Sequence, residues 1–287
     1  MSKLIIMRGL PASGKSTKAK EIVEQGGNYV RLNRDLLRTM LHFNKWSGNN
    51  EAQTIVAMKS LARTYLTGGV SVVVDDTNLG DKHRQSWSSI AQECDAKFEV
   101  VDMETSLSEC LIRDLNRDQR VGNAVILCMA LQYGIYPKPA KPFVICDIDG
   151  TVADCEHRKH HLSGEKKDWK SFFSDMKSDT PRTEVIEQLR EYHDNGHEVV
   201  FVSARPEDYR NVTESWLNEH VHINYVNLIM RRSGDKRLDT EVKEQIFKTY
   251  FDGKYPIEVV FDDRPSIVRM WRSHGLNVID VGDGVEF

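Results

Sequence analysis

The stretch Gly9-Leu10-Pro11-Ala12-Ser13-Gly14-Lys15-Ser16 decides the fold of the first half of the chain. It follows the apolar run Leu4–Met7 and precedes a helical pattern through Ile22, so it joins a strand to a helix. The two glycines let the backbone turn tightly, and successive N–H groups can then point inward at phosphate oxygens. The pattern predicts a loop that binds a nucleoside triphosphate, in which Lys15 reaches the β- and γ-phosphates and Ser16 binds Mg²⁺. The expected nucleotide contacts are Gly9, Ser13, Gly14, Lys15, Ser16 and Thr17.

The first half alternates strand and helix patterns, which indicates a parallel sheet flanked by helices. The expected strands are Leu4–Met7, Tyr29–Leu32, Val70–Val74 and Phe98–Val101, with helices that begin near Lys15, Asp35, Asn50, Asp81 and Ser106. Ligands of such sheets bind at the carboxyl ends of the strands. The polar residues that follow each strand are therefore candidate site residues.

Asp35 and Arg38 follow the second strand and are three residues apart on one predicted helix face. Asp35 is either the N-cap of that helix or a general base that takes a proton from an incoming hydroxyl. The spacing does not separate these interpretations, and one residue can do both.

Asp75-Asp76-Thr77-Asn78 follows the third strand. Adjacent acids near a phosphate loop are typical of a site close to Mg²⁺, whereas an Asp-Thr-Asn turn that caps a helix is the structural alternative. We place Asp76 and Asn78 among the candidate substrate contacts.

Arg113, Arg117 and Arg120 follow the fourth strand at helical spacing. A solvated, salt-bridged helix face is the usual meaning of such a run. In a phosphotransferase the same arginines can lie on a lid over the transferring phosphoryl group.

Pro137–Pro142 contains three prolines in six residues, which predicts a stiff linker between two domains. We expect a first domain over residues 1–138 and a second over 142–287, both of the α/β class. A polar segment at about residues 154–180 has the character of an inserted cap.

The second half opens with a predicted strand, Phe143–Cys146, that runs into Asp147-Ile148-Asp149-Gly150-Thr151. The two aspartates leave the strand on the same side, and a bound Mg²⁺ would explain why both stay charged. One carboxylate can attack phosphorus while the other transfers protons. A polar Asx-type turn is the structural alternative.

Further polar residues follow predicted strands or lie on predicted helices of this half. The strands are His197–Val202 and Ile257–Phe261. The helices are one that begins near Pro181 and ends before Gly196, Val242–Tyr250 and Ile267–Trp271. The residues that we single out there are Ser203, Arg205, Lys243, Asp262 and Asp263.

Length and composition are compatible with two soluble domains. The 287 residues carry a net charge of −4, with a slightly basic first half and an acidic second half. Neither half is basic enough to coat nucleic acid without regard to sequence or structure. The five cysteines form no CxxC pair and predict reduced thiols in a cytoplasmic compartment. We expect no signal peptide, no membrane span and no membrane partner.

With these motifs in place, the chain resembles the bacteriophage bifunctional polynucleotide kinase–phosphatases, which heal nucleic-acid ends, over nearly its whole length. The first half resembles their P-loop 5′-hydroxyl kinase, and the second resembles their 3′-phosphatase of the haloacid dehalogenase (HAD) superfamily. Alanine stands at Ala12 and Ala204, where the family pattern commonly has glycine.

In the kinase half, the resemblance implies that Asp35 is the general base and that Arg38 holds the phosphate of the acceptor. It implies that Lys15 and Arg117 stabilise the transferring phosphate. The spacing after Arg117 differs from the family pattern, so Arg120 is the alternative lid residue and a further nucleotide contact.

In the phosphatase half, the resemblance implies that Asp147 is the nucleophile and Asp149 the general acid–base. Arg158 matches a substrate-binding arginine, and Lys243 matches the lysine that binds phosphate. Ser203 and Arg205 match the second motif and contact the substrate. Asp147, Asp149, Asp262 and Asp263 would form the metal site.

The resemblance implies an enzyme that uses ATP or another NTP with Mg²⁺, acts on RNA or DNA ends and works with a ligase. It would act in the cytoplasm, which is that of the host cell if a phage encodes the protein. The resemblance is also compatible with a homo-oligomer. One alternative is a small-molecule kinase fused to a small-molecule HAD phosphatase, because fold does not fix function. The other is an NTP-switched adaptor with inert sites.

Overall fold

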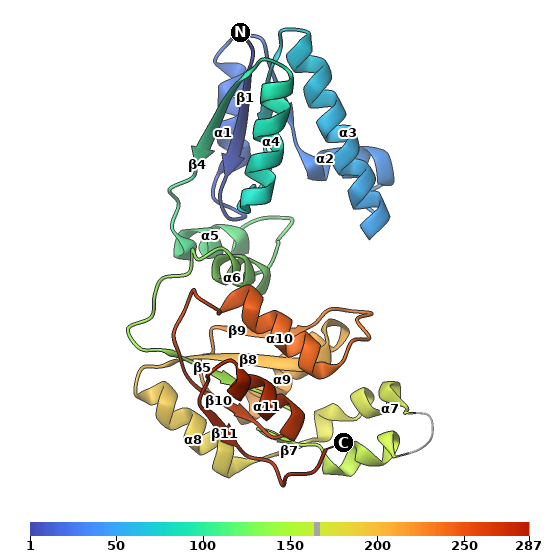
Figure 1. The fold of residues 1–287 in the computed structure, drawn as a ribbon, viewed down its shortest axis with the longest axis vertical. Helices are drawn as coiled ribbons and strands as arrows, with labels where there is room; N and C mark the ends of the chain where they lie inside the picture. The colour runs from blue at the N-terminus through green and yellow to red at the C-terminus, as the bar shows by residue number, and fades with distance from the viewer. Residues whose placement is uncertain (164–166, 287) are drawn as a thin grey trace. The chain divides into compact units, whose positions relative to one another are not determined.

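The computed structural model describes residues 1–163 and 167–286. They form two compact units, Met1–Tyr133 and Gly134–Phe287, each with its own core (Figure 1). The proline-rich stretch lies in the second unit, where the ring of Tyr136 packs against those of Phe143 and Tyr255. Of the expected cap, residues 164–166 lie outside the described residues.

The first unit is a parallel sheet, as the alternating pattern predicts, and its strand order is β2-β3-β1-β4. Its strands are β1 (Lys3–Arg8), β2 (Tyr29–Leu32), β3 (Ser71–Val74) and β4 (Lys97–Asp102). Its helices are α1 (Lys15–Glu24), α2 (Arg34–His42), α3 (Gly48–Thr67), α4 (Asp81–Glu93), α5 (Leu107–Leu115) and α6 (Asn123–Gln132). The sequence pattern did not predict α6.

Helices cover both faces of this sheet, which is why β1 and β3 are apolar on both sides. One face packs against α3 and α4, and the other packs against α1 (Figure 1). The first face buries Leu4, Ile6, Val72 and Val74 with Met58, Ala62, Leu66, Trp87, Ile90 and Ala91. The second face buries Ile5, Met7 and Val73 with Ala19.

The second unit is a parallel sheet with the strand order β11-β10-β5-β8-β9. Its strands are β5 (Phe143–Cys146), β8 (Glu198–Pro206), β9 (Asn227–Arg231), β10 (Ile257–Asp262) and β11 (Val278–Asp280). Its longer helices are α8 (Thr183–Asp194), α9 (Arg210–His220), α10 (Asp239–Tyr250) and α11 (Pro265–Ser273). Of these strands and longer helices, β9, β11 and α9 were not predicted from the sequence pattern.

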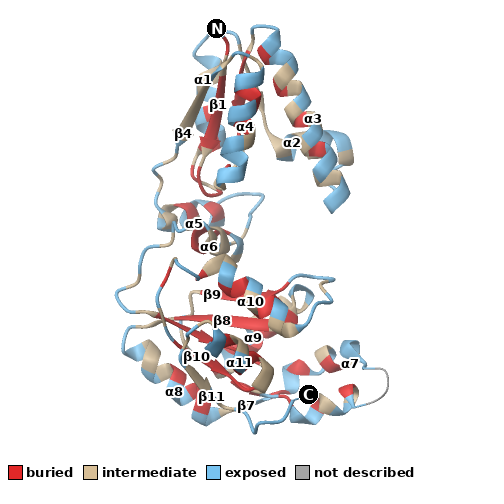
Figure 2. Cartoon of the chain, viewed as in Figure 1, coloured by how far each residue is buried: buried red, intermediate tan, exposed pale blue. Residues whose placement is uncertain are grey.

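The chain builds this sheet outward from β5 in one direction and then crosses to its other side for β10 and β11. The strands of this sheet are largely buried in Figure 2, whereas the outer faces of its helices are exposed. A ligand site is expected where the strand order reverses, beyond the carboxyl ends of β5 and β10.

A short antiparallel pair, β6 (Ala153–Asp154) and β7 (Thr180–Pro181), closes an insert that follows β5. The insert holds the 3₁₀ helices η1 (Glu156–Leu162) and η2 (Met176–Ser178) with α7 (Trp169–Ser174) between them. A third 3₁₀ helix, η3 (Glu207–Tyr209), follows β8. No helix in the described part of the chain is both long and apolar enough to cross a bilayer.

Candidate active sites

The loop between β1 and α1 closes around the side chain of Lys15. The ammonium group of Lys15 donates hydrogen bonds to the carbonyl of Gly9 at 3.0 Å and to that of Leu10 at 2.6 Å. Burial lowers the pKa of this lysine, partly opposed by Asp75. A phosphate oxygen could replace these carbonyls and would compensate the buried positive charge better than they do.

The loop depends on small residues at its tight positions. Gly14 has φ +92° and directly precedes α1, and Ala12 also adopts a left-handed φ of +62°. A Cβ atom on Gly9 would lie 2.7 Å from Oγ of Ser13. No side chain caps the N-terminus of α1 and its first turn holds no acid, so its N–H groups are available to an anion. Ser16 and Thr17 are exposed in this turn.

Asp75 and Asp76 have different surroundings although they are adjacent. Asp75 is buried and accepts hydrogen bonds from Arg31 at 2.9 and 2.5 Å. Asp76 lies 3.4 Å from Arg34, and burial raises its pKa to about 6. The helix-capping interpretation is wrong, because Gly80 is the N-cap of α4.

Asn78 is a structural residue of the turn after β3. It is 1% exposed, has φ +45°, and donates from its amide to the carbonyl of Met7 at 2.9 Å. This bond ties the end of β3 to the end of β1, next to the phosphate loop. The structure thus gives Asn78 an indirect place at the site, rather than the direct substrate contact that we expected.

Asp35 is not the N-cap of α2, because Asn33 holds that position and accepts from the N–H of Leu36 at 2.9 Å. The Asp35 side chain is 73% exposed and lies 2.9 Å from a nitrogen of Arg38. Glu51 on α3, which sequence reasoning missed, binds the other side of Arg38 at 2.8 and 3.2 Å. Arg38 therefore joins α2 to α3 and already has carboxylate partners where a phosphate was expected.

The three arginines after β4 do not share one helix face, because α5 ends at Leu115. Arg113 lies on α5 and pairs with Glu109 at 2.8 Å. Arg117 and Arg120 lie in the connection to α6. The buried Asp114 organises this connection, a role that the sequence analysis missed. It accepts hydrogen bonds from the N–H groups of Val121 at 3.1 Å and Gly122 at 2.8 Å.

In the second unit, three carboxylates meet beyond the ends of β5 and β10. Ligand oxygens of Asp147, Asp262 and Asp263 lie within 4.8 Å of one another, and all three residues are buried. Lys243, from α10, lies 3.0 Å from Asp147 and 2.8 Å from Asp262. The indole N–H of Trp271 donates to Asp262 at 3.1 Å and fixes that carboxylate.

The charges in this cluster do not balance, because three acids face Lys243 and Arg264, and Arg264 is itself paired with Asp239. Burial, opposed only in part by Lys243, raises the pKa of Asp147 well above its ordinary value. Burial and the neighbouring Asp262 raise the pKa of Asp263 to about 6. A hard divalent cation bound by carboxylate oxygens would remove this imbalance, so the residues present fit Mg²⁺.

Two glycines bring the backbone close to Asp263. A Cβ atom on Gly150, which has φ +79°, would overlap the carboxylate of Asp263. A Cβ atom on Gly282 would overlap its backbone carbonyl. Thr151 also donates to the Asp263 carboxylate, at 3.4 Å. Asp263 is therefore held from two sides by segments in which a larger residue would collide with it.

Asp149 does not belong to the carboxylate cluster, contrary to our expectation of a metal ligand. Its side chain binds Arg158 and Arg205. Burial alone would raise the pKa of Asp149, but the two arginines outweigh it and lower that pKa. Arg158 and Arg205 are fully buried and also bind Asp179, at 2.6 and 2.8 Å. They position Asp149 from behind, whereas we expected them to contact the substrate directly.

Ser203 likewise lies behind the site. It is 1% exposed, and its hydroxyl accepts the N–H of Arg205 at 3.2 Å. This bond orders the end of β8, from which Arg205 reaches Asp149.

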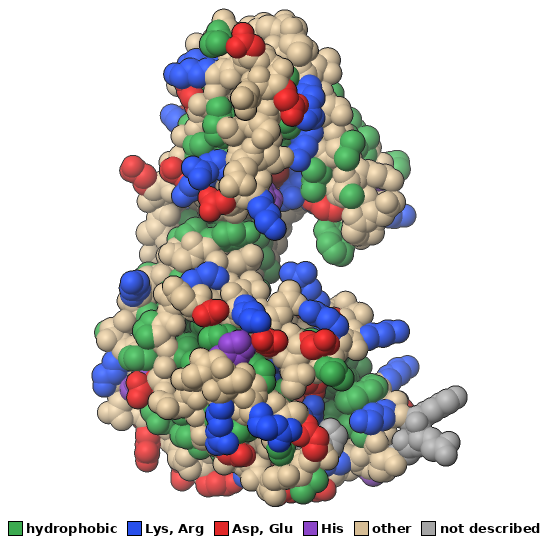
Figure 3. Space-filling model, in the orientation of Figure 1, with side chains coloured by type: hydrophobic (Ala, Val, Ile, Leu, Met, Phe, Trp, Pro, Cys, Tyr) green, Lys and Arg blue, Asp and Glu red, His purple; other side chains and the backbone are tan. Residues whose placement is uncertain are grey.

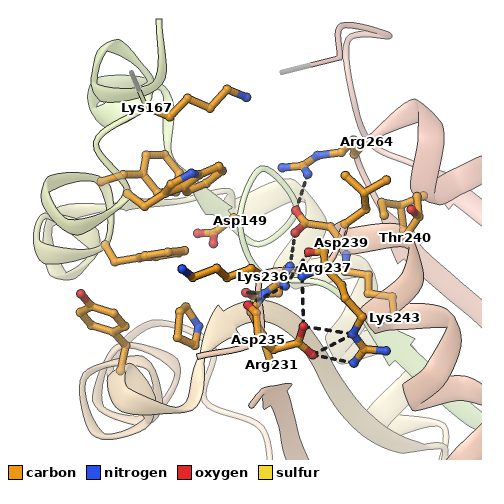
Figure 4. A pocket seen from close by; sticks show the side chains of 18 of the residues that line it. Asp149, Lys167, Arg231, Asp235, Lys236, Arg237, Asp239, Thr240, Lys243 and Arg264 are labelled. Carbon is orange, nitrogen blue, oxygen red and sulfur yellow. Dashed lines mark hydrogen bonds and ion pairs between the residues drawn. The ribbon is translucent and has the colours of Figure 1, made fainter. Parts of the chain in front are cut away.

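A pocket of about 910 Å³ opens beside this cluster, and Figure 4 shows part of its lining. Asp147, Asp149 and Lys243 line it together with residues that sequence reasoning missed. Among these, Asp239 binds Arg231 and Arg264 from the first turn of α10 (Figure 4). Arg231 lies at the end of β9, a strand that was not predicted. The sequence pattern therefore could not indicate that Asp239, Arg231 and Arg264 lie together.

Comparisons with known proteins found matches for both units. Residues 141–286 match the family model described as the polynucleotide kinase PNKP phosphatase domain, and residues 4–131 match one described as an AAA domain. A protein of Autographa californica nuclear polyhedrosis virus, named as a bifunctional polynucleotide kinase/RNA ligase, is 29% identical over 94% of this chain and 41% of its own length. An L-seryl-tRNA(Sec) kinase of Methanococcus maripaludis is 33% identical over 43% of this chain and 49% of its own length.

The chain thus spans less than half the length of these curated relatives. Among solved structures, a chain from the structure of a Pnkp1/Rnl/Hen1 complex is 26% identical, with a TM-score of 0.43. That match covers 99% of this chain and 97% of the other.

Proposed function

Since the chain belongs, through residues 141–286, to the family of polynucleotide kinase PNKP phosphatase domains, we propose that it heals nucleic-acid ends in two reactions. The first unit transfers the γ-phosphoryl group of ATP or another NTP to the 5′-hydroxyl of an RNA or DNA strand. The second unit removes a 3′-phosphate. The products are the 5′-phosphate and 3′-hydroxyl ends that a ligase joins.

In the kinase reaction, the 5′-oxygen attacks the γ-phosphorus while its proton passes to Asp35, and the bond to the leaving nucleoside diphosphate breaks. Lys15 and the N–H groups of the phosphate loop bind the nucleotide phosphates. The exposed carboxylate of Asp35 supports this role. Arg38 would hold the acceptor phosphate only after leaving at least one of its present carboxylates.

In the phosphatase reaction, the Asp147 carboxylate attacks the phosphorus, and the bond from phosphorus to the 3′-oxygen breaks. Asp149 gives a proton to that oxygen and later takes one from the water that hydrolyses the acyl phosphate. To act as an acid, Asp149 must weaken its contacts with Arg158 and Arg205. The observation that carries the proposal is Asp147 beside Lys243 in the lining of a large pocket.

Mg²⁺ is the divalent cation that we propose for both sites. In the phosphatase, Asp147, Asp262 and Asp263 would hold it, where it would neutralise the charge of the phosphate and of the carboxylates. In the kinase, the Ser16 hydroxyl would be a ligand. Asp149, turned toward its arginines, is not included in this set.

An RNA ligase is the partner that we propose. The viral relative carries both activities in its name, which supports a functional link between end healing and joining. The cysteines form no disulfide among the described residues, which supports a reducing cytoplasmic setting.

The test is direct. The protein is incubated with γ-labelled ATP and 5′-hydroxyl RNA or DNA strands, and separately with the same strands that carry a 3′-phosphate. We expect label transfer in the first case and phosphate release in the second. Nucleosides, sugars and sugar phosphates compete as small substrates. If they react better than the strands, the protein is a small-molecule kinase fused to a small-molecule phosphatase.

A further inference from the structure

The pocket beside Asp147 has an aromatic wall that the chemistry at phosphorus does not use. Trp169, Phe172 and Phe173 of the insert line it, together with Tyr209 of η3. Trp169 and Phe173 stack with ring centroids 5.9 Å apart and an interplanar angle of 24°. Phe173 continues to Tyr209 at 5.3 Å. The rings therefore form a supported layer rather than separate contacts.

Within this layer Trp169 is the ring that is offered to a ligand. Phe172 is 3% exposed and packs under Arg158, whereas Trp169 is 43% exposed. A tryptophan that served only the core of the insert would gain free energy by being buried. Its exposure in a pocket lining, with its orientation fixed by Phe173, is what a stacking surface requires.

Cations surround the same pocket. The ammonium groups of Lys170 and Lys236 have no ion-pair partner within the described ranges, and that of Lys167 lies over the Trp169 ring at 5.6 Å. Figure 4 shows Lys167 on one side of the pocket and Arg231 and Arg264 on the other. On the face in Figure 3, Lys and Arg side chains gather with hydrophobic ones near α7 and the loop before α10. Exposed aromatic rings among cations are typical of sites for single-stranded nucleic acid.

The volume gives a third, independent indication. A pocket of about 910 Å³ is at the upper end of the range for small-molecule sites, so it has room for much more than a phosphoryl group. Because Asp147 and Trp169 line the same pocket, a substrate whose phosphate reaches the nucleophile can extend to the aromatic wall.

We propose that Trp169, supported by Phe173 and Tyr209, is the stacking platform for a base at a single-stranded 3′ end, and that it selects polynucleotide 3′-phosphates over small phosphate esters. Lys170 and Lys236 attract the backbone phosphates of the same strand. This inference rests on the proposed phosphatase function and specifies how its substrate is recognised.

The test compares two oligonucleotide 3′-phosphates that differ only in whether the terminal sugar and its neighbour carry bases or are abasic. Stacking on one ring is worth about 1–3 kcal/mol, so Trp169→Ala should lower kcat/KM on the base-bearing strand by roughly 5- to 150-fold. It should leave the abasic strand nearly unchanged. Trp169→Phe should restore most of the activity, because a ring remains. Trp46→Ala, which removes an exposed tryptophan of the first unit, is the matched control.

The outcomes separate the two levels of the proposal. An equal loss of kcat/KM on the two strands would show that Trp169 only stabilises the insert. Unchanged kcat/KM on both strands would show that Trp169 does not stack on the substrate. Either result would overturn the stacking inference. Phosphate release by the wild type would still support the proposed 3′-phosphatase function. A wild-type protein that released no phosphate from either strand, yet hydrolysed small phosphate esters, would overturn the proposed function itself.

Discussion

Ala12 adopts a backbone conformation that costs an alanine free energy. Its φ of +62° lies in the left-handed region, which costs an L-residue roughly 1–2 kcal/mol. A glycine would avoid this cost but would lose roughly 0.5–1 kcal/mol more conformational entropy on folding. We therefore expect Ala12→Gly to stabilise the first unit by up to about 1.5 kcal/mol.

Urea unfolding of the first unit, followed by circular dichroism, measures this effect. Ala19→Gly is the matched control, because Ala19 is buried in the middle of α1 and the substitution there should destabilise. If Ala12→Gly destabilised the protein as much as Ala19→Gly does, the left-handed conformation at residue 12 would carry no strain.

Asp76 makes the stability of the first unit depend on pH. Burial raises its pKa from 3.8 to about 6, so the folded state binds a proton more tightly than the unfolded chain does. Stability from this group is therefore present below about pH 4 and is lost as the pH rises to about 6. Asp76→Asn should raise the free energy of unfolding at pH 7.5 by up to about 3 kcal/mol, less the lost contact with Arg34.

Denaturation curves at pH 4 and pH 7.5 give the difference between the two proteins. The gain should shrink toward zero at the lower pH, and Asp118→Asn on the exposed connection should show no such trend. A gain that stayed the same at both values would assign the effect to packing rather than to the charge of Asp76.

At the scale of an element, the connection between α5 and α6 is held by a single side chain. Asp114 is 1% exposed and accepts two backbone N–H groups from residues 121 and 122. Removing it breaks both hydrogen bonds, and because the two donors are only partly buried and water can reach them, the cost is about 0.5–1.5 kcal/mol for each bond. Asp114→Ala should therefore loosen the connection that carries Arg117 and Arg120 and lower the kinase kcat while the phosphatase is unaffected.

Limited proteolysis at Arg117 and Arg120 reports the loosening separately from activity. The variant should be cleaved there faster than the wild type, whereas Asp118→Ala, on the same connection but exposed, should not. Normal cleavage together with a lowered kinase rate would mean that Asp114 acts on the nucleotide site by another route.

The same connection shows where the sequence was informative and where it was not. Strand β1, the phosphate loop and the start of α1 were predictable, because an apolar run, two glycines and a lysine act within a few residues of one another. Arg117 was placed on a helix, because its spacing from Arg113 is helical. No local sequence pattern predicted that α5 would end before Asn116, or that the buried Asp114 would organise the residues up to Gly122.

The acid cluster of the second unit was predictable for the same reason, since Asp147, Asp262 and Asp263 all follow apolar runs of the sequence. Their grouping follows from parallel strands that end at one edge of the sheet. Asp239 and Asp179 were missed because their meaning depends on arginines far away in the sequence. Asp149 was predicted to be a metal ligand for the same lack of long-range information, because Arg158 and Arg205, which bind its side chain away from the neighbouring acids, are distant in the sequence.

At the scale of the whole molecule, the two sites use separate sets of residues on separate units. Asp147→Asn should abolish phosphate release, because it removes the attacking group, and should leave label transfer to 5′-hydroxyl ends unchanged. Asp35→Asn should lower label transfer by about 10²–10⁴-fold and spare phosphate release.

Both assays are run on each purified variant, with circular dichroism to show that it is folded. Mixing the two variants should restore the complete conversion of an end that carries a 5′-hydroxyl and a 3′-phosphate. Loss of both activities in either folded variant would contradict the assignment of one reaction to each unit.

The order of the strands in the second sheet has a consequence for the protein while it is being made. The phosphatase cluster joins Asp147 to Asp262 and Asp263, so it cannot assemble until the ribosome has released nearly the entire unit. Every side chain assigned to the kinase precedes residue 134, at which the second unit begins. At about 5–20 residues per second, the nascent first unit has roughly 6–26 seconds in which to fold before Asp263 is added. Under the proposed function, the growing polypeptide therefore completes the unit that adds a phosphate before it completes the unit that removes one.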